Sequence, residues 1–316
     1  MSPTLALGCA SLGNLYRAID DERATATVDA AWDAGIRYFD TAPHYGLGLS
    51  ERRLGAALAD RPRASYTVST KVGRMLEPVP GGGDQMDDGG FAVPATHRRV
   101  WDFSRDGVRR CLDESLDRLG LDRIDLVLLH DPEDHADQAI AEGYPALAEL
   151  RDQGVVGAIG TGSKDVPFLT RFVTECEPDE IIVAGRYTLL EQPALDTILP
   201  ACAAAGTAVL NAGVFNSGLL AVERPHAGLP YEYGPAPAAV VERAAAIAEV
   251  CVAHGTTLPA AALAFAGSHP VVRSVIVGAD SPDQVRRNAA LFGTPPPAEL
   301  WPALVEAGLL DPRVLP

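Results

Sequence analysis

The sequence lacks the features of several large protein classes, and each absence excludes a kind of structure or function. Its five cysteines are odd in number and widely scattered, and no Cys-x-x-Cys pair occurs. We therefore expect buried, reduced thiols in a cytoplasmic protein rather than a disulfide framework. No apolar run reaches the roughly 18 residues of a membrane span. Residues 1–4 show no basic segment leading into an apolar one, so we expect no signal peptide.

Basic residues are also scarce, with 26 Lys and Arg against 42 Asp and Glu and a net charge of −16. Because phosphate binding needs clustered Lys and Arg, we expect neither nucleic acid nor an anionic membrane as a partner. A Gly-x-Gly-x-x-Gly motif after the first strand is missing, which argues against a Rossmann cofactor site. No His-x-His occurs and the seven histidines show no ligand spacing, so we expect no metal.

What the chain does contain is a globular composition, 47% hydrophobic and 22% charged over 316 residues. Short, continuous apolar runs alternate with helical segments eight times, as expected for parallel strands that are buried on both faces. The runs span residues 5–8, 37–40, 66–71, 125–130, 156–160, 180–184, 208–211 and 274–278. This alternation predicts an α/β fold, a (β/α)8 TIM barrel that forms one domain over 1–316, in preference to an open doubly wound sheet.

Helix ends and loops complete this picture. Four positions are predicted helix N-caps, namely Asp20 or Asp21, Ser50, Ser104 and Ser281. The segment 72–102 is long and rich in glycine, and such loops usually carry function. We expect it to lie over the loop after the strand 37–40 as a substrate lid; the alternative is a tolerated insertion. A second irregular loop spans 213–237, and a proline-rich tail, 294–316, is expected to wrap the outside.

Three consecutive strands end on a polar residue, at Asp40, Lys71 and His130, and Tyr45 lies in the loop after the first of them. Active sites of TIM barrels lie at the carboxyl ends of the strands, so we expect these four side chains to meet. A phenol has a pKa near 10, which a neighbouring cation lowers. Lys71 would be that cation, held by Asp40, while His130 orients the substrate oxygen. The group predicts Tyr45 as a proton donor and acceptor.

Other interpretations remain open. Taken singly, Asp40 is explained by a turn, Lys71 by the surface and His130 by the core. Lys71 is also a candidate Schiff-base nucleophile, although that leaves Tyr45 without a role. Residues 214–219 and 278–282 follow the last two strands, where backbone amides and a helix N-terminus suit a diphosphate. A barrel that binds a cofactor as a sensor, without turnover, is a further alternative.

With these motifs in place, the chain resembles the aldo-keto reductases over nearly its whole length. The matching segments are Asp-Thr-Ala-Pro-His-Tyr-Gly at 40–46, Ser-Thr-Lys at 69–71 and Leu-Leu-His at 128–130. The resemblance implies a TIM barrel that uses NAD or NADP without a Rossmann domain, with Asp40, Tyr45, Lys71 and His130 as the catalytic group. The segments 101–104, 184–190 and 215–218 are similar to the family's sugar dehydrogenase branch.

That branch implies oxidation of a cyclic sugar hemiacetal, L-fucose or a similar aldose, to a lactone. A reductase of another aldehyde or ketone, or a pyridoxal-type dehydrogenase, is the alternative. Trp101 and Arg186 are expected as substrate contacts, with Tyr231 and Tyr233 as further candidates for the wall of the substrate site. The resemblance assigns the cofactor to Ser163, Lys164, Phe215, Asn216, Ser217, Gly218, Gly278, Asp280, Gln284 and Asn288.

Three positions depart from the family pattern. Gly162-Ser163-Lys164 replaces the usual Ser-Asn that grips the carboxamide, and Ala212-Gly213 replaces a tyrosine that stacks on the nicotinamide. Asp280 stands where a Lys or Arg usually pairs with the 2′-phosphate of NADP. Because a carboxylate repels that phosphate, the sequence predicts NAD as the preferred cofactor.

Overall fold

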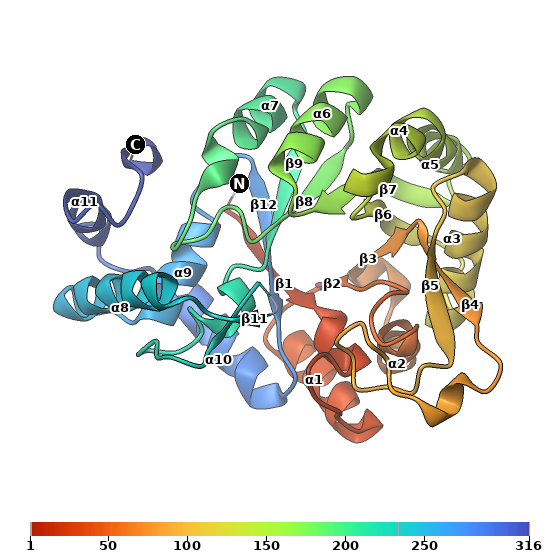
Figure 1. Cartoon of the computed structure of the whole chain (residues 1–316), viewed down its shortest axis with the longest axis horizontal. Coiled ribbons are helices and arrows are strands. Elements are labelled where there is room, and N and C mark those ends of the chain that lie inside the picture. Colours follow the sequence, from red (N-terminus) through yellow and green to blue (C-terminus); the bar gives the residue numbers. More distant parts are fainter. Residues whose placement is uncertain (1, 233, 316) are drawn as a thin grey trace.

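The computed structural model describes residues 2–232 and 234–315 and contains a closed barrel of eight parallel strands (Figure 1). The order around the barrel is β1-β12-β9-β8-β7-β6-β3-β2. The strands are β1 (Thr4–Gly8), β2 (Tyr38–Asp40), β3 (Thr67–Val72), β6 (Ile124–His130), β7 (Val156–Ser163), β8 (Glu180–Ala184), β9 (Ala208–Ala212) and β12 (Val272–Gly278). The predicted TIM barrel is therefore confirmed.

Strand β1 closes the barrel, and its register places the carboxyl ends of its two neighbouring strands at the same height. Gly8 is paired with Gly278 on one side and with Asp40 on the other. On the far side of β2, Asp40 pairs with Ser69, two residues before Lys71. The ends of β12, β1, β2 and β3 therefore lie side by side at one rim, so that residues from both ends of the chain share one face.

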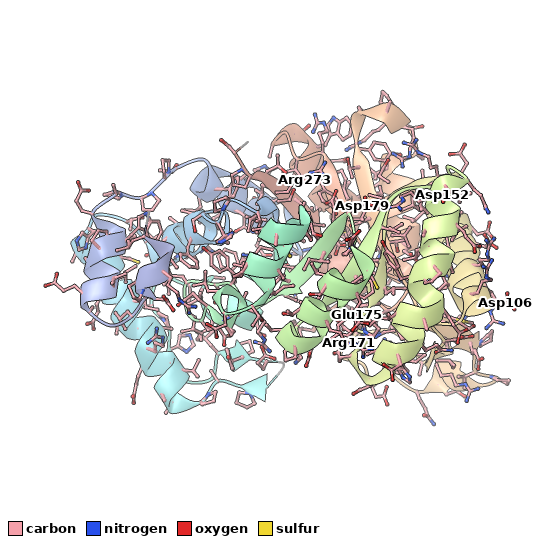
Figure 2. All side chains as sticks on the ribbon, turned by 90° about the horizontal axis from the view of Figure 1, so that it is seen from above. Asp106, Asp152, Arg171, Glu175, Asp179 and Arg273 are labelled. Carbon is pink, nitrogen blue, oxygen red and sulfur yellow. The ribbon has the colours of Figure 1, made fainter. Side chains whose placement is uncertain are left out.

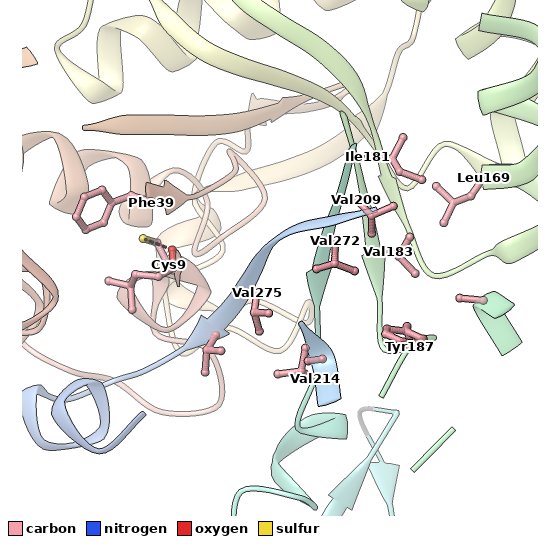
Figure 3. Packing of buried hydrophobic residues seen from close by; sticks show 14 of the residues in the cluster. Cys9, Phe39, Leu169, Ile181, Val183, Tyr187, Val209, Val214, Val272 and Val275 are labelled. Carbon is pink, nitrogen blue, oxygen red and sulfur yellow. Dashed lines mark hydrogen bonds between the residues drawn. The ribbon is translucent and has the colours of Figure 1, made fainter. Parts of the chain in front are cut away.

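The strands are buried on both faces because side chains alternate along them. Ile181 and Val183 point outward and pack with Leu169 of the surrounding helices (Figure 3), whereas Ile182 points into the barrel. The barrel interior is filled by a small separate cluster of buried side chains, Ala6, Leu126, Leu128, Ile182, Leu210 and Ile276. This double burial explains why the strands read as continuous apolar runs.

Helices surround the barrel, with charged side chains such as Arg171 and Glu175 pointing to solvent (Figures 1 and 2). They are α1 (Asp21–Asp33), α2 (Leu49–Leu58), α3 (Arg105–Leu119), α4 (Ala136–Gln138), α5 (Tyr144–Asp152), α6 (Val166–Cys176), α7 (Ile198–Ala205), α8 (Ala238–Ala253), α9 (Leu258–Ala266), α10 (Pro282–Phe292) and α11 (Leu300–Glu306). Asp20, Ser104 and Ser281 accept the capping hydrogen bonds of α1, α3 and α10, as predicted.

Ser50 is not a cap, contrary to the prediction. Helix α2 begins at Leu49, after Gly48 in a left-handed conformation with φ of 81°. The Ser50 hydroxyl instead donates to the backbone oxygen of Cys9 (2.7 Å) and lies 2.8 Å from Thr41 Oγ1. It therefore ties the loops after β1 and β2 together beneath the barrel rim.

Three segments are more regular than the sequence predicted. The segment 72–102 contains an antiparallel hairpin of β4 (Arg74–Pro78) and β5 (His97–Trp101), and the loop 213–237 contains the short pair β10 (Pro230–Tyr231) and β11 (Gly234–Pro235). The tail carries α11, which packs on α8. Helix α9 was not predicted at all. It is apolar on every side, so its sequence shows no amphipathic period.

All five cysteines are buried and free. No single helix in the described ranges is long and apolar enough to cross a membrane. Helices α8 and α9 together meet the length and composition of a span, but the chain bends by 98° between them.

Candidate active site

The centre of the site is the ammonium of Lys71, which is buried and makes three hydrogen bonds. It donates to Asp40 Oδ2 (2.8 Å), to the Tyr45 phenol oxygen (3.0 Å) and to the backbone oxygen of Thr41 (2.9 Å). The other carboxylate oxygen of Asp40 accepts from Ser69 Oγ at 2.7 Å. Every donor of the ammonium therefore has an acceptor, which offsets the cost of burying the charge. Three of the four predicted residues meet here.

The loop that carries Tyr45 is held by a close approach of two backbones. Gly13, after β1, and Gly46, after β2, lie so near each other that a Cβ on either residue would overlap backbone atoms. Gly46 also has a φ of 63°, which L side chains rarely adopt. Only glycine fits these two positions, and their contact fixes the phenol against Lys71.

His130 completes the predicted group. Its buried ring lies 5.9 Å from the Tyr45 ring, centroid to centroid, at an interplanar angle of 88°. Its Nδ1 is buried and finds no partner within residues 2–232 and 234–315. Its Nε2 lies 3.8 Å from Asp131 Oδ2, which accepts from Arg74 of the β4–β5 hairpin at 2.7 Å. Arg74, which sequence reasoning missed, thus links the hairpin to the histidine through Asp131.

Burial and charge set the protonation states. Burial raises the pKa of Tyr45 to about 12, although Lys71 acts in the opposite direction. The sequence predicted the effect of Lys71 correctly, but it did not anticipate that burial would outweigh it. Burial alone would lower the pKa of Lys71, yet Asp40 and Tyr45 raise it overall. Burial, followed by Arg74 and Lys71, holds the pKa of His130 well below its usual value, so the ring is neutral.

The β4–β5 hairpin lies over the Tyr45 loop, as predicted for the segment 72–102. Leu76, Phe91 and Val93 of this segment form a small apolar cluster with Leu47 of that loop, and Leu15, Tyr45 and Leu49 pack against it. Arg99 of β5 pairs with the buried Asp87 and donates to the backbone oxygen of His44 at 3.2 Å. Trp101, a predicted substrate residue, is 42% exposed, and the Arg74 guanidinium lies 5.3 Å from its ring centroid.

The remaining predicted residues lie on the other half of the rim, after β7, β8, β9 and β12. Lys164 and Arg186 both pair with Glu232 of the 213–237 loop, at 2.8 and 3.0 Å. Ser163 Oγ donates to Glu133 at 2.9 Å. Tyr231 donates to Glu191 at 3.0 Å. Tyr233 lies outside the described residues.

The turn after β9 has an unusual backbone. Asn216, Ser217 and Gly218 have φ values of 46°, 60° and 101°, and Phe215 directly precedes them. Asn216 Nδ2 donates to Glu191 at 2.9 Å, whereas its Oδ1 is buried and has no partner among the described residues. Successive left-handed residues and a free amide oxygen are typical of a turn that receives a ligand.

At the end of β12, Asp280 is engaged by two arginines that the sequence did not indicate. Arg17 Nε donates to Asp280 Oδ2 at 2.6 Å, and Arg23 Nε donates to the Asp280 backbone oxygen at 2.7 Å. The Asp280 amide donates to Gln284 Oε1 at 3.0 Å. Gly278 ends β12, and Asn288 lies on α10. Because Arg17 pairs with a residue 263 positions away, the sequence around either residue does not indicate the contact.

This half of the rim fits a dinucleotide. The N-terminus of α10, an 11-residue helix, faces the end of β12 and favours a phosphate. Four basic side chains, Arg17, Arg23, Lys164 and Arg186, lie around the ends of β1, β7, β8 and β12. The unpartnered Oδ1 of Asn216 would accept from an amide or hydroxyl. Within the described residues, no group of three His, Cys, Asp or Glu could hold a metal.

Comparisons with known proteins agree with this arrangement. A sequence model of the Aldo/keto reductase family matches residues 4–308. The chain is 52% identical to D-threo-aldose 1-dehydrogenase from Pseudomonas sp, over 98% of this chain and 94% of that protein. It is 37% identical to pyridoxal 4-dehydrogenase from Microbacterium luteolum, over 97% and 94%. The solved holo structure of an aldo-keto reductase from Bacillus halodurans superposes with a TM-score of 0.76 at 27% identity, covering 97% of this chain and 92% of that one.

Proposed function

The chain belongs to the aldo/keto reductase family, and on this premise we propose that it oxidises the anomeric carbon of a cyclic aldose to a lactone, with NAD as the preferred cofactor. As an oxidoreductase of this family it acts on CH–OH groups with a nicotinamide dinucleotide. The observation that carries the aldose assignment is the 52% identity to D-threo-aldose 1-dehydrogenase over nearly the whole of both chains.

The buried group around Lys71 supports a proton-transfer role for Tyr45. In the proposed reaction, the cofactor, when bound, would supply the acceptor for the hydride that leaves the anomeric carbon. Tyr45 Oη removes the proton of the anomeric hydroxyl, so that the C1–O bond becomes the carbonyl of the lactone. The Lys71 ammonium, 3.0 Å away, stabilises the phenolate that this role requires. Asp40 holds the ammonium in place through its 2.8 Å contact.

His130 has a different task. Because its ring is neutral, it can donate one hydrogen bond to the substrate oxygen without competing with Tyr45 for the proton. Its Nε2 is the nitrogen nearest Asp131, while Nδ1 is buried. We place the reacting oxygen between His130 and Tyr45, whose rings lie 5.9 Å apart.

The cofactor preference rests on Asp280. Its carboxylate lies where α10 begins, and it binds Arg17 and approaches Arg23 within 3.5 Å. A 2′-phosphate placed there would meet a carboxylate, and the nearby cations are already engaged. This supports NAD over NADP. Ser163, Lys164, Phe215–Gly218, Gly278, Gln284 and Asn288 are proposed to hold the rest of the cofactor.

Pyridoxal is a second candidate substrate, after the relative that is 37% identical over 97% of this chain. The β4–β5 hairpin offers the 42% exposed ring of Trp101 to a flat substrate, whereas a sugar makes more use of polar groups. Arg186 and Trp101 remain the proposed substrate contacts in either case.

The test is to follow the absorbance of the reduced nicotinamide with purified protein, NAD or NADP, and a panel that includes L-fucose and pyridoxal. Turnover of an aldose with NAD, with the lactone identified as product, supports the proposal. Turnover of pyridoxal alone would replace the aldose assignment. Cofactor binding without turnover of any substrate would favour a sensor, and borohydride trapping of a substrate on Lys71 would favour a Schiff-base lyase.

A further inference from the structure

Beside the proposed catalytic residues lies a second histidine, His44, to which no role has been assigned. Its ring centroid is 5.5 Å from that of His130 and 6.1 Å from that of Tyr45. With the 5.9 Å between Tyr45 and His130, the three polar rings form a nearly equilateral triangle. The fourth neighbour is Phe91 of the β4–β5 lid, 5.3 Å away and perpendicular to the His44 ring.

The hydrogen bonds of His44 do not explain its presence there. Arg99 binds its backbone oxygen at 3.2 Å, but that bond would form with any residue at this position. Its Nδ1 is buried and has no partner in the described chain. The contacts within the described chain therefore give the imidazole of His44 no structural hydrogen bond, and its ring is free to serve a ligand through the other nitrogen.

The protonation state of His44 makes it a selective hydrogen-bonding group. Burial, and then Arg99, Arg74 and Lys71, lower its pKa to about 2. The neutral ring has one N–H, and a buried N–H without an acceptor is costly. The proton therefore belongs on Nε2, because Nδ1 is buried without an acceptor within the described residues. This leaves a donor beside the rings of Tyr45 and His130.

We propose that His44 binds the hydroxyl on the carbon next to the one that is oxidised, and that it thereby selects substrates with adjacent oxygens. The inference rests on the proposed function, which places the reacting oxygen between Tyr45 and His130. The oxygen on the neighbouring carbon then lies within reach of the third ring, that of His44. His44 is a specificity-determining residue on this account, since it takes no part in the proton transfer.

The expected effect of His44 on substrate preference follows from the way in which a binding site rejects substrate analogues. A site that hydrogen-bonds a hydroxyl discriminates strongly against a substrate that lacks it, because the buried polar group is then left unpaired. Replacing the ring by a hydrocarbon of similar shape removes this penalty. The variant His44→Phe should therefore lose activity on the hydroxylated substrate and keep it on the deoxy analogue.

The experiment compares kcat/KM for L-fucose and 2-deoxy-L-fucose in the wild type, His44→Phe and His44→Asn. We expect His44→Phe to lower kcat/KM for L-fucose by about 10-fold or more and to change the value for the deoxy sugar by less than about 3-fold. His44→Asn keeps a donor and should recover part of the preference. His97→Phe, which changes a histidine that lies 3.0 Å from Thr96 Oγ1 on the same lid, serves as the matched control.

The outcomes are distinguishable. An equal loss on both sugars would show that His44 only supports the fold or His130, and it would overturn the inference alone. An unchanged preference in His44→Phe would also overturn it. Failure of the wild type to oxidise either sugar would overturn the proposed function, and this inference with it. If His44→Phe does not fold, the same comparison is made with His44→Asn, for which a smaller loss confined to L-fucose is expected.

Discussion

The ammonium of Lys71 lies 3.0 Å from the phenol oxygen of Tyr45, yet burial raises the pKa of that phenol to about 12. The cation therefore does not make Tyr45 a strong base at neutral pH, but it reduces the cost of forming the phenolate inside the barrel. The proton acceptor of the proposed oxidation is thus available only in part at neutral pH.

A pH dependence follows from this raised pKa. Oxidation of an aldose needs the deprotonated phenol, whose fraction rises with pH all the way to the pKa. We expect kcat/KM for the oxidation to increase from about pH 7 to about pH 10 without reaching a plateau. Reduction of an aldehyde with NADH needs the protonated phenol and should show no such activation. A plateau for the oxidation near pH 7 would contradict a base with this pKa.

The ion pair of Asp40 and Lys71 predicts a strong coupling in stability. Both side chains are buried, so Asp40→Asn or Lys71→Met each leaves one charge without its partner. Each single variant should lose about 3–5 kcal/mol of unfolding free energy in urea titrations. The double variant should lose clearly less than the sum of the two. Additive losses would mean that the two side chains do not depend on each other.

The two neutral histidines predict acid sensitivity. Folding holds the pKa of His44 at about 2 and that of His130 well below its usual value. The unfolded chain binds protons at these rings near pH 6.5, while the folded chain does not. The unfolding free energy should therefore fall as pH drops below about 6.5, by up to about 1.4 kcal/mol per pH unit for each ring.

Urea titrations between about pH 5 and 7.5 check this slope. The variant His44→Phe should show a shallower decline than the wild type, and His226→Phe, which changes an exposed histidine, should not differ from it. An equal slope in all three proteins would rule out His44 as a source of the acid sensitivity.

Asp280 predicts how the cofactor preference can be changed. The variant Asp280→Ala removes the carboxylate and frees the Arg17 guanidinium and the Nη2 group of Arg23, while Arg23 Nε stays on the backbone oxygen of residue 280; the freed groups then pair with a phosphate. We expect the ratio of kcat/KM with NADP to that with NAD to rise by about 10-fold or more, as one charge-assisted contact would give. Asp283→Ala changes a nearby carboxylate in the first turn of α10 that pairs with Arg286 at the surface; it is the control and should leave the ratio unchanged.

The proposed catalytic group could be predicted from the sequence because it follows from a periodic pattern. Asp40, Lys71 and His130 each lie at or next to the carboxyl end of a strand, and β2, β3 and β6 are neighbours in the barrel, so their ends meet. The caps at Asp20, Ser104 and Ser281 are equally local signals. Such features depend on a few adjacent residues and on the regular geometry of the fold.

Contacts between distant loops could not be predicted in this way. Arg17 meets Asp280, and Glu232 meets Arg186, only after the barrel has closed, and no spacing in the sequence records either pair. Ser50 resembles a cap, but the N-cap of α2 is the left-handed Gly48, two residues earlier. The pKa of Tyr45 depends on how deeply the β4–β5 hairpin and the barrel rim bury the phenol, and this depth cannot be deduced from the sequence.

The most direct test of this account is the rate of NADH formation from L-fucose by the wild type and by Tyr45→Phe. The account predicts that the variant binds NAD as well as the wild type, judged by protein fluorescence, but loses about 10²–10⁴-fold in kcat/KM. A variant that binds NAD and still oxidises L-fucose at close to the wild-type rate would contradict the assignment of Tyr45 as the proton acceptor.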